Sequence, residues 1–200
     1  MKRLALSIFL LTTVTWLGGC KHSSVTPAEP TKAEYGVLSA YISRNFRGDA
    51  AQNKPYIVII KQTLHLSEDP RWVSALYKYE PTLKTIHHEV FRALLETNRH
   101  PSSFQSSFTL PVPYEIVESS EVSPAHGWQG PSCGFLELSR VGFSGDGTHA
   151  AFYSLSRIGF TRDGSHATCR ELWESGYLVI MEKGPNSDWK IVKEVQLWVT

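Results

Sequence analysis

The sequence lacks a long apolar segment, a surplus of either charge, and the short motifs of common cofactor sites. Its longest mainly apolar stretch, residues 4–17, is too short to cross a bilayer comfortably as a helix. The 200 residues include 20 Lys+Arg and 19 Asp+Glu, so we expect no basic stripe and no nucleic-acid partner. Neither a P-loop nor a dinucleotide-binding fingerprint occurs, and we expect no cofactor.

The spacing of polar side chains predicts neither a catalytic site nor a metal site. The sequence Gly-Phe-Ser-Gly-Asp around Ser144 is close to the Gly-x-Ser-x-Gly elbow of α/β-hydrolases, but its fifth residue is Asp and no parallel βα pattern surrounds it. His87 and His88 are adjacent, so they project about 100° apart on a helix and form no i, i+4 zinc pair. His149 and His166 would have to converge to bind a metal. We interpret Ser144 as a turn residue.

The first 20 residues have the pattern of an export signal. Lys2 and Arg3 precede the apolar stretch, which ends in Leu-Gly-Gly-Cys at 17–20. This ending resembles the lipobox of bacterial lipoproteins, in which the cysteine is diacylated and the chain is cleaved before it. The resemblance implies a signal peptide at 1–19 and lipid attachment at Cys20, which would anchor the protein to the membrane essentially permanently. Lys21 stands where Asp retains lipoproteins in the inner membrane of well-studied Gram-negative bacteria, so the resemblance favours the outer membrane, facing the periplasm.

The remaining chain is long enough for one domain. Cleavage before Cys20 would leave 18 Lys+Arg and 19 Asp+Glu, a formal charge of −1. Residues 20–31 carry Ser and Pro without apolar periodicity, which is typical of a flexible tether. Residues 32–200, in a chain of 42% hydrophobic composition, suffice for a single core.

The first half of this domain shows mainly helical patterns. Thr31 and Glu34 form a capping-box pattern ahead of apolar residues at helical spacing, and Gly48 is a plausible stop. The segments expected after this helix are a buried strand at 56–60, a short helix from Asp69-Pro70 to Tyr77, a helix from Pro81 to Asn98, and one strand, 114–117, in an irregular connection over 102–131.

The second half predicts strands, and it contains one phrase twice. Residues 139–155 and 156–172 are identical at nine of 17 positions. Asp-Gly turns at 144–147 and 161–164 and a turn at 184–186 separate the expected strands, which are 135–143, 149–160, 165–170, 177–182 and 189–199. We therefore predict an α+β fold, with helices on one face of an antiparallel meander of about five strands. In the last strand, Trp189, Ile191, Val195, Leu197 and Val199 should share one face.

The repeated phrase is interpreted as hairpin architecture used twice. The strand 149–160, at roughly 3.3 Å per residue, would place the two Asp-Gly turns more than about 30 Å apart. The duplicated residues could not then form one symmetric site.

Cys133 and Cys169 form a candidate disulfide, because two cysteines remain in an exported chain after Cys20 is set aside. If the two turns contain only residues 144–147 and 161–164, residue 143 faces 148 and residue 160 faces 165. Residue 133 is then level with 158, and residue 158 is level with 167. The cysteines would then lie two strands apart, about 9.6 Å, which is beyond disulfide reach unless the chain before Phe135 bends over the sheet.

Several stretches of the C-terminal half resemble a group of uncharacterised exported bacterial proteins. They are the phrase Ser-Arg-Val-Gly-Phe and residues 150–153, 176–183, 189–192 and Trp198. The resemblance brings no activity with it. The phrase Phe-Ser-x-Asp-Gly also resembles a repeat of periplasmic β-propellers, but a period of 17 residues in two copies excludes that fold. Helices followed by a curved meander are similar to cystatin-like and nuclear-transport-factor-like cones.

Two functions remain open from the sequence. The lipobox and tether, without a catalytic constellation, favour a membrane-tethered module that binds an envelope protein or another envelope component. The alternative is a small-ligand-binding or hydrolytic enzyme with a cone-shaped cavity, lined by polar residues such as Tyr114, His126 and Arg157.

Overall fold

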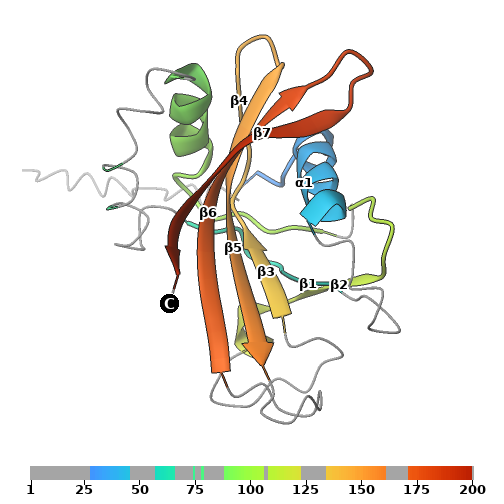
Figure 1. Ribbon diagram of the computed structural model, residues 1–200, viewed down its shortest axis with the longest axis vertical. Helices are drawn as coiled ribbons and strands as arrows, with labels where there is room; N and C mark the ends of the chain where they lie inside the picture. Colours follow the sequence, from blue (N-terminus) through green and yellow to red (C-terminus); the bar gives the residue numbers. More distant parts are fainter. Residues whose placement is uncertain are drawn as a thin grey trace, which may run out of the picture.

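The chain forms one mixed β-sheet with helices beside it (Figure 1). The computed structural model describes residues 28–45, 57–65, 74, 78, 88–105, 108–122, 134–160 and 171–199. The elements are α1 (Lys32–Asn45), β1 (Ile57–Ile60), β2 (Tyr114–Val117), the 3-10 helix η1 (Ser119–Val122), β3 (Gly134–Leu138), β4 (Gly142–Phe143), β5 (His149–Phe160), β6 (Glu171–Lys183) and β7 (Trp189–Val199). Residues 88–97 are also helical. The predicted α+β class is confirmed.

Within the described residues the sheet has seven strands, in the order β2-β1-β3-β5-β6-β7 with β4 paired to β5. From β3 to β7 all pairing is antiparallel, but β1 pairs parallel with both β2 and β3. The predicted antiparallel meander of about five strands is confirmed for β3 to β7, but the sheet also contains β1 and β2, whose parallel pairing was not predicted. All four residues of β1 are buried, which is typical of a parallel strand, but its partners lie far along the chain and leave no local sequence signal.

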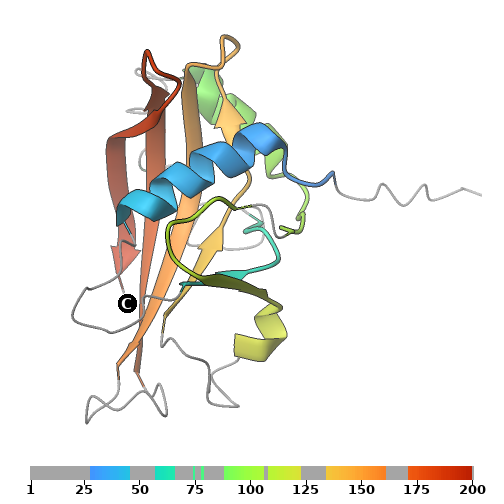
Figure 2. The ribbon, with the colours of Figure 1, turned by 90° about the vertical axis from the view of Figure 1, so that its right-hand side faces the viewer.

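Successive side chains of β5 enter two different hydrophobic clusters. Phe152 is buried with Leu38 and Ile42 of α1, whereas the adjacent Tyr153 is buried with Leu94 of helix 88–97. Because neighbouring side chains of a strand point to opposite faces, α1 and helix 88–97 lie on opposite sides of the sheet (Figures 1 and 2). The expectation that the helices share one face is wrong, since the central strands are apolar on both faces and need cover on both.

The turn between β4 and β5 is wider than the Asp-Gly pattern predicts. Phe143 pairs with Ala150, not with residue 148. Asp146 Oδ1 accepts hydrogen bonds from the Ser144 hydroxyl (2.5 Å) and from the Thr148 N–H (3.0 Å) and hydroxyl (2.8 Å). These bonds hold the residues between Phe143 and Ala150 in a loop around the Asp146 side chain, so a simple two-residue turn is not formed.

The connection between β5 and β6 is also longer than predicted. Phe160 pairs with Glu171 and Ile158 pairs with Trp173. The register that placed residue 158 level with 167 is therefore wrong. The predicted turn 161–164 and strand 165–170 lie outside the described residues, and the strand predicted at 177–182 is the second half of β6.

The last strand, β7, changes the face that its side chains occupy. Trp189 and Ile191 pack against the cluster on the α1 side, whereas Val195, Leu197 and Trp198 pack against the cluster on the other side. Two register shifts interrupt the pairing of β7 with β6. A bulge sets two residues opposite one and thereby reverses the alternation. The predicted single apolar face of 189–199 is wrong for this reason.

The predicted capping box at the start of α1 is confirmed and has a second role. The Thr31 N–H donates to Glu34 (2.7 Å) and the Glu34 N–H donates to the Thr31 hydroxyl (3.3 Å). The same carboxylate accepts two bonds from the Arg140 guanidinium (3.1 and 2.9 Å) and one from the Val141 N–H (3.1 Å). The Asn98 side chain bonds both the N–H (2.8 Å) and the carbonyl (3.0 Å) of Arg140. One junction therefore joins α1, helix 88–97 and the chain between β3 and β4.

Candidate functional site

The turn between β6 and β7 presents polar and aromatic side chains beside α1. The Gly184 N–H donates to the Asp188 carbonyl (2.7 Å) and the Ser187 N–H donates to the Gly184 carbonyl (2.9 Å). Ser187 has a φ of 64°, in the left-handed region that non-glycine residues seldom occupy. The turn predicted at 184–186 is confirmed, and it carries Ser187, Asp188 and Trp189 to the side of the sheet that α1 covers.

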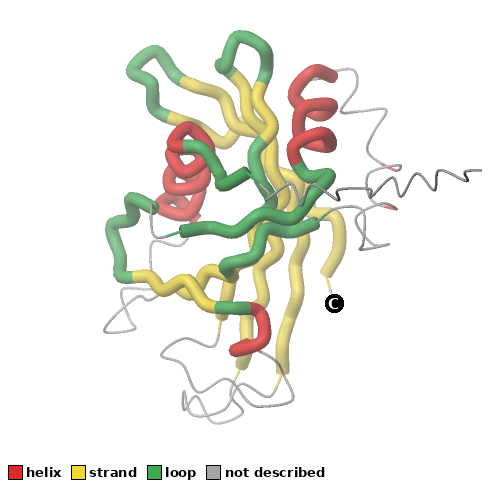
Figure 3. Tube along the Cα trace, turned by 180° about the vertical axis from the view of Figure 1, so that it is seen from behind, coloured by secondary structure: helices red, strands yellow, loops and turns green. Residues whose placement is uncertain are grey.

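The β4–β5 hairpin lies next to this turn. The Lys183 N–H donates to the Thr148 carbonyl (2.8 Å), which joins the two hairpins. Both turns project from the same end of the sheet, beyond α1 (Figure 3). Phe143 pairs with Ala150, whose side chain belongs to the cluster of α1, so Phe143 also faces α1.

The helix contributes a wall of small side chains. Ala33, Gly36 and Ala40 lie at spacings of three and four, and therefore on one stripe of α1. Ala33 and Gly36 are exposed and Ala40 is half-buried. The opposite stripe of α1 fills the core with Leu38 and Ile42, so small outward residues leave space between the helix and the hairpins.

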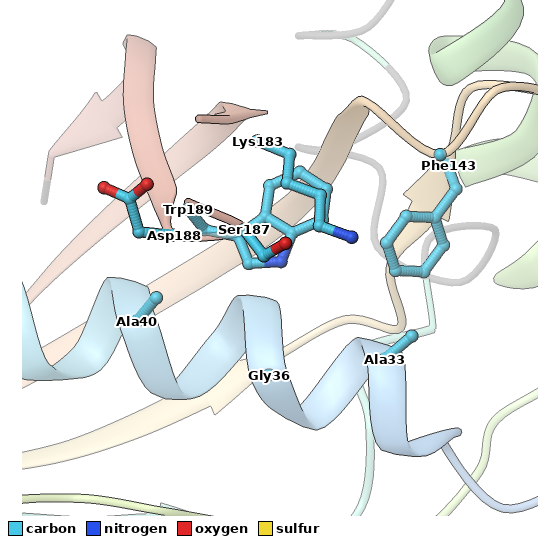
Figure 4. Close-up of a pocket in the computed structure, with 9 residues that line it drawn as sticks. Ala33, Gly36, Ala40, Phe143, Lys183, Ser187, Asp188 and Trp189 are labelled. Carbon is cyan, nitrogen blue, oxygen red and sulfur yellow. The ribbon is translucent and has the colours of Figure 1, made fainter. Parts of the chain in front are cut away.

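Together these elements line an open pocket of about 650 Å³, hereafter the aromatic pocket (Figure 4). Its lining consists of Ala33, Gly36, Ala40, Phe143, Gly147, Lys183, Ser187, Asp188 and Trp189. The rings of Phe143 and Trp189 have centroids 6.0 Å apart and planes at 55°. Lys183 Nζ lies 6.0 Å from the centroid of the Trp189 ring. This arrangement offers two aromatic surfaces and one cation to an incoming group.

The aromatic pocket is lined by one cation, Lys183, and one carboxylate, Asp188, and they differ in their ion pairing. Asp188 forms an ion pair with Lys190 at 3.5 Å, and Figure 4 shows its carboxylate directed away from Phe143. Lys183 extends toward Phe143 in the same view. Within the described part of the chain, no carboxylate forms an ion pair with Lys183. The lining therefore contains one carboxylate that is already paired and one cation that is not paired with a described carboxylate.

A second hollow of about 610 Å³, the tether-side hollow, lies along the other flank of α1. It is lined by Glu29, Pro30, Lys32, Tyr35, Gly36, Ser39 and Thr109. Hydrogen bonds hold its far wall against the helix: the Gln105 N–H donates to the Tyr35 hydroxyl (2.7 Å) and the Thr109 N–H to the Ser39 hydroxyl (3.0 Å). Gly36 lines both hollows.

Ser144 is placed as a turn residue, as predicted. Its hydroxyl donates to Asp146, and its backbone N–H donates to the His149 carbonyl (3.0 Å). The His149 ring bonds the Thr148 hydroxyl (2.9 Å). The hydrogen bonds from the hydroxyl of Ser144 and from Thr148 lower the pKa of Asp146 to about 2.

The polar residues expected to line a cone-shaped cavity are not gathered by the described structure. The Tyr114 hydroxyl donates to the Phe108 carbonyl (3.2 Å) at the edge of the sheet. Arg157 pairs with Glu137 (3.0 Å) and Glu174 (2.7 Å). His126, the third residue named for that cavity, lies outside the described residues, as do His87 and His166.

The two copies of the repeated phrase have different surroundings. The first, at 139–143, crosses between β3 and β4, where Arg140 pairs with Glu34. The second, at 156–160, is the end of β5, where Arg157 pairs with other carboxylates. The same local sequence therefore performs two structural roles.

The three cysteines lie outside the described residues, so Cys20 lipidation and the Cys133–Cys169 disulfide remain predictions. No group of three or more metal-ligating side chains is present among the residues that the structure describes. In that same part of the chain, no helix has the length and hydropathy to cross a membrane. Comparisons of the chain with protein-family models, with curated proteins and with solved structures find no match.

The aromatic pocket was not predicted from the sequence. Its lining comes from α1 and from two hairpins more than 100 residues further along the chain. One signal was present: Gly36 interrupts an otherwise regular helical pattern without ending it. The cross-strand pairing of Lys183 with Trp189 depends on the hairpin register and could not be read locally.

Proposed function

We propose that this protein is a membrane-tethered extracytoplasmic lipoprotein whose domain, residues 32–200, binds a partner protein or another envelope component. The lipobox-like sequence at 17–20 supports a lipid anchor on Cys20 in the outer membrane, facing the periplasm. The two hollows that meet at Gly36 support the binding role, and they are the observation that carries it.

The position of these hollows suits a tethered receptor. The domain begins at Lys32, and Glu29 and Pro30 already line the tether-side hollow. A chain extends at most about 3.5 Å per residue, so the eight residues from 21 to 28 reach no further than about 28 Å from a lipidated Cys20. A component of the same membrane, or one that passes close to it, would meet the hollows first.

Site-specific photocrosslinking in intact envelopes tests this proposal. A photoreactive residue at Ala33 or Ser187, which line the aromatic pocket, should form a discrete adduct with a partner. The matched control places the same photoreactive residue at Arg99, an exposed position just after helix 88–97. Adducts that also form at Arg99, or none at either pocket position, would contradict a binding role for the hollows.

A small-ligand-binding or hydrolytic enzyme with a cone-shaped cavity is the second candidate. The observation in its favour is the volume of the aromatic pocket, which lies in the range of small-molecule sites, about 300–1,000 Å³. Turnover of model esters or glycosides by purified protein, lost in Lys183→Gln and Trp189→Phe, would favour it over the partner-binding role.

A further inference from the structure

Gly36 is a glycine that no contact inside the described fold requires. A Cβ at Gly142 would lie 2.2 Å from the Leu94 backbone nitrogen, and one at Gly176 would lie 2.6 Å from the Trp198 ring. A Cβ at Gly36 would meet nothing within 4 Å, although glycine is among the weakest helix formers. Its helical conformation also needs no positive φ. The open space above Gly36 is therefore available to a group from outside the fold.

That open space lies between the two hollows. The aromatic pocket and the tether-side hollow lie on opposite flanks of α1, and among the described residues Gly36 is the one that lines both. Any side chain at this position would stand between them. Without one, an extended chain could cross the helix and place side chains on both flanks, because alternate side chains of an extended segment point in opposite directions.

The aromatic pocket specifies the chemistry of the crossing segment. The Phe143 and Trp189 rings suit an aromatic or aliphatic side chain, and the small residues of α1 leave room for it. Lys183 has no acidic partner among the described residues, while Asp188 is engaged by Lys190. Charge complementarity therefore favours a carboxylate next to the apolar side chain.

We propose that an extended segment of a partner protein crosses α1 at Gly36, with an aromatic or aliphatic side chain packed on the aromatic pair of Phe143 and Trp189 and a neighbouring carboxylate against Lys183. This inference rests on the proposed function and names the chemistry of its partner. A recess accepts a projecting side chain, whereas a lipid surface would meet the convex hairpin tips. The observations thus favour a peptide that carries an apolar side chain next to a carboxylate over the membrane itself.

The probe is N-acetyl-Phe-Asp-amide, compared with its neutral counterpart N-acetyl-Phe-Asn-amide. Full-length protein labelled with 5-fluorotryptophan reports binding through the fluorine resonance of Trp189, assigned with Trp189→Phe. We expect the Asp probe to shift this resonance with a dissociation constant of about 1–10 mM. The Asn probe should bind about twofold to fivefold more weakly, as the loss of a partly exposed ion pair predicts.

Three variants isolate the contacts. Lys183→Gln should abolish the difference between the two probes, whereas Arg92→Gln, at an exposed position of helix 88–97 on the other side of the sheet, should preserve it. Gly36→Gln should weaken binding of the Asp probe without lowering the unfolding midpoint, because it replaces glycine with a better helix former in open space. Arg44→Gln, on the exposed last turn of α1, is the matched control and should bind normally.

The outcomes separate this inference from the function on which it rests. Equal binding of the two probes, or no Trp189 shift up to about 10 mM, overturns the acidic-peptide inference even if the crosslinks at Ala33 and Ser187 form. Binding to phosphatidylglycerol vesicles that is lost in Lys183→Gln, without a response to the peptides, assigns the pocket to lipid and also overturns it. Absence of the crosslinks contradicts the proposed function itself.

Discussion

The buried carboxylate of Glu34 shows how one side chain can combine a local and a long-range role. Its side chain is 3% exposed and pairs with an Arg140 side chain that is 14% exposed. Burial raises the pKa of Glu34, but the hydrogen bonds from Arg140 and from the backbone of Thr31 and Val141 outweigh this and lower it below 4.5. The ionised form is therefore stabilised by folding.

Glu34→Gln should destabilise the protein by about 3 kcal/mol at pH 7, because it leaves a buried guanidinium without its anion. A group whose pKa is depressed in the folded state contributes stability above its unfolded pKa and loses it as the pH falls through the folded pKa. The difference between wild type and Glu34→Gln should therefore be full at pH 7 and shrink below about pH 4.5. Urea unfolding measured between pH 7 and pH 3 checks both.

The control for this measurement is Glu118→Gln. Glu118 pairs with Lys61 across the surface, with side chains 52% and 44% exposed, so its loss should change stability little at any pH. An equal effect of the two substitutions would contradict the role assigned to burial.

Ser187 occupies a backbone conformation that suits glycine better. Its φ of 64° is unfavourable for a residue with a Cβ, so Ser187→Gly should stabilise the protein by about 1 kcal/mol. Gly147 has a φ of 68°, and a Cβ there would meet nothing within 4 Å, so it allows the reverse substitution to be tested. Gly147→Ala should destabilise the protein by a similar amount. Thermal unfolding of both variants would show whether φ alone decides if a substitution raises or lowers the stability.

At the scale of elements, helix 88–97 lies directly against β4 at Gly142. Gly142 in the first copy of the repeated phrase lets the Leu94 backbone approach to a distance that no Cβ permits. The equivalent Gly159 lies within β5, so the phrase keeps its glycine although the surroundings differ. A glycine in a strand often marks such a close approach, but the sequence does not say which element approaches.

Gly142→Ala should destabilise the protein by about 3 kcal/mol, because helix 88–97 would have to move away from the sheet. Gly36→Ala, in the open part of α1, should instead stabilise it by about 0.5–1 kcal/mol through helix propensity. Chemical unfolding of the two variants under one condition compares the same substitution in two surroundings. Destabilisation by both would indicate that space at Gly36 is not free.

The edge strand β7 is protected by its own irregularity. It is 11 residues long and forms the end of the sheet, where unpaired backbone groups favour aggregation. Two register shifts and the charges of Lys190, Lys193 and Glu194 interrupt a flat apolar edge. Bulges and edge lysines are common ways of preventing edge-to-edge pairing.

At the scale of the whole molecule, attachment to the membrane is expected to depend on Cys20. Cys20→Ser removes the acceptor thiol, so the protein should lose palmitate labelling and leave the membrane fraction. Metabolic labelling with a clickable fatty acid, followed by fractionation of the envelope, measures both. Unchanged labelling would contradict the prediction that the protein is a lipoprotein. Cys133→Ser serves as the control because it keeps Cys20.

Some parts of the fold could be predicted from the sequence because they depend on residues close together in the chain. The Thr31–Glu34 capping box and the bounds of β5 were predicted, since capping and strand alternation act over a few residues. The face of each β7 residue, the β5–β6 register and the parallel pairing of β1 were missed. Each of these is set by a partner strand, whose position the local pattern does not contain.

The sequence by itself determined the α+β class, the turn at 184–186, the role of Ser144 and the expectation of a lipid anchor. Only the tertiary structure decided that α1 and helix 88–97 cover opposite faces, that Arg140 meets Glu34, and that Gly36, Phe143, Lys183 and Trp189 share one pocket. The physical reason is that β5 and β6 are apolar on both faces. Burying both requires two layers of cover, and the choice of element for each layer is made by packing across the whole chain.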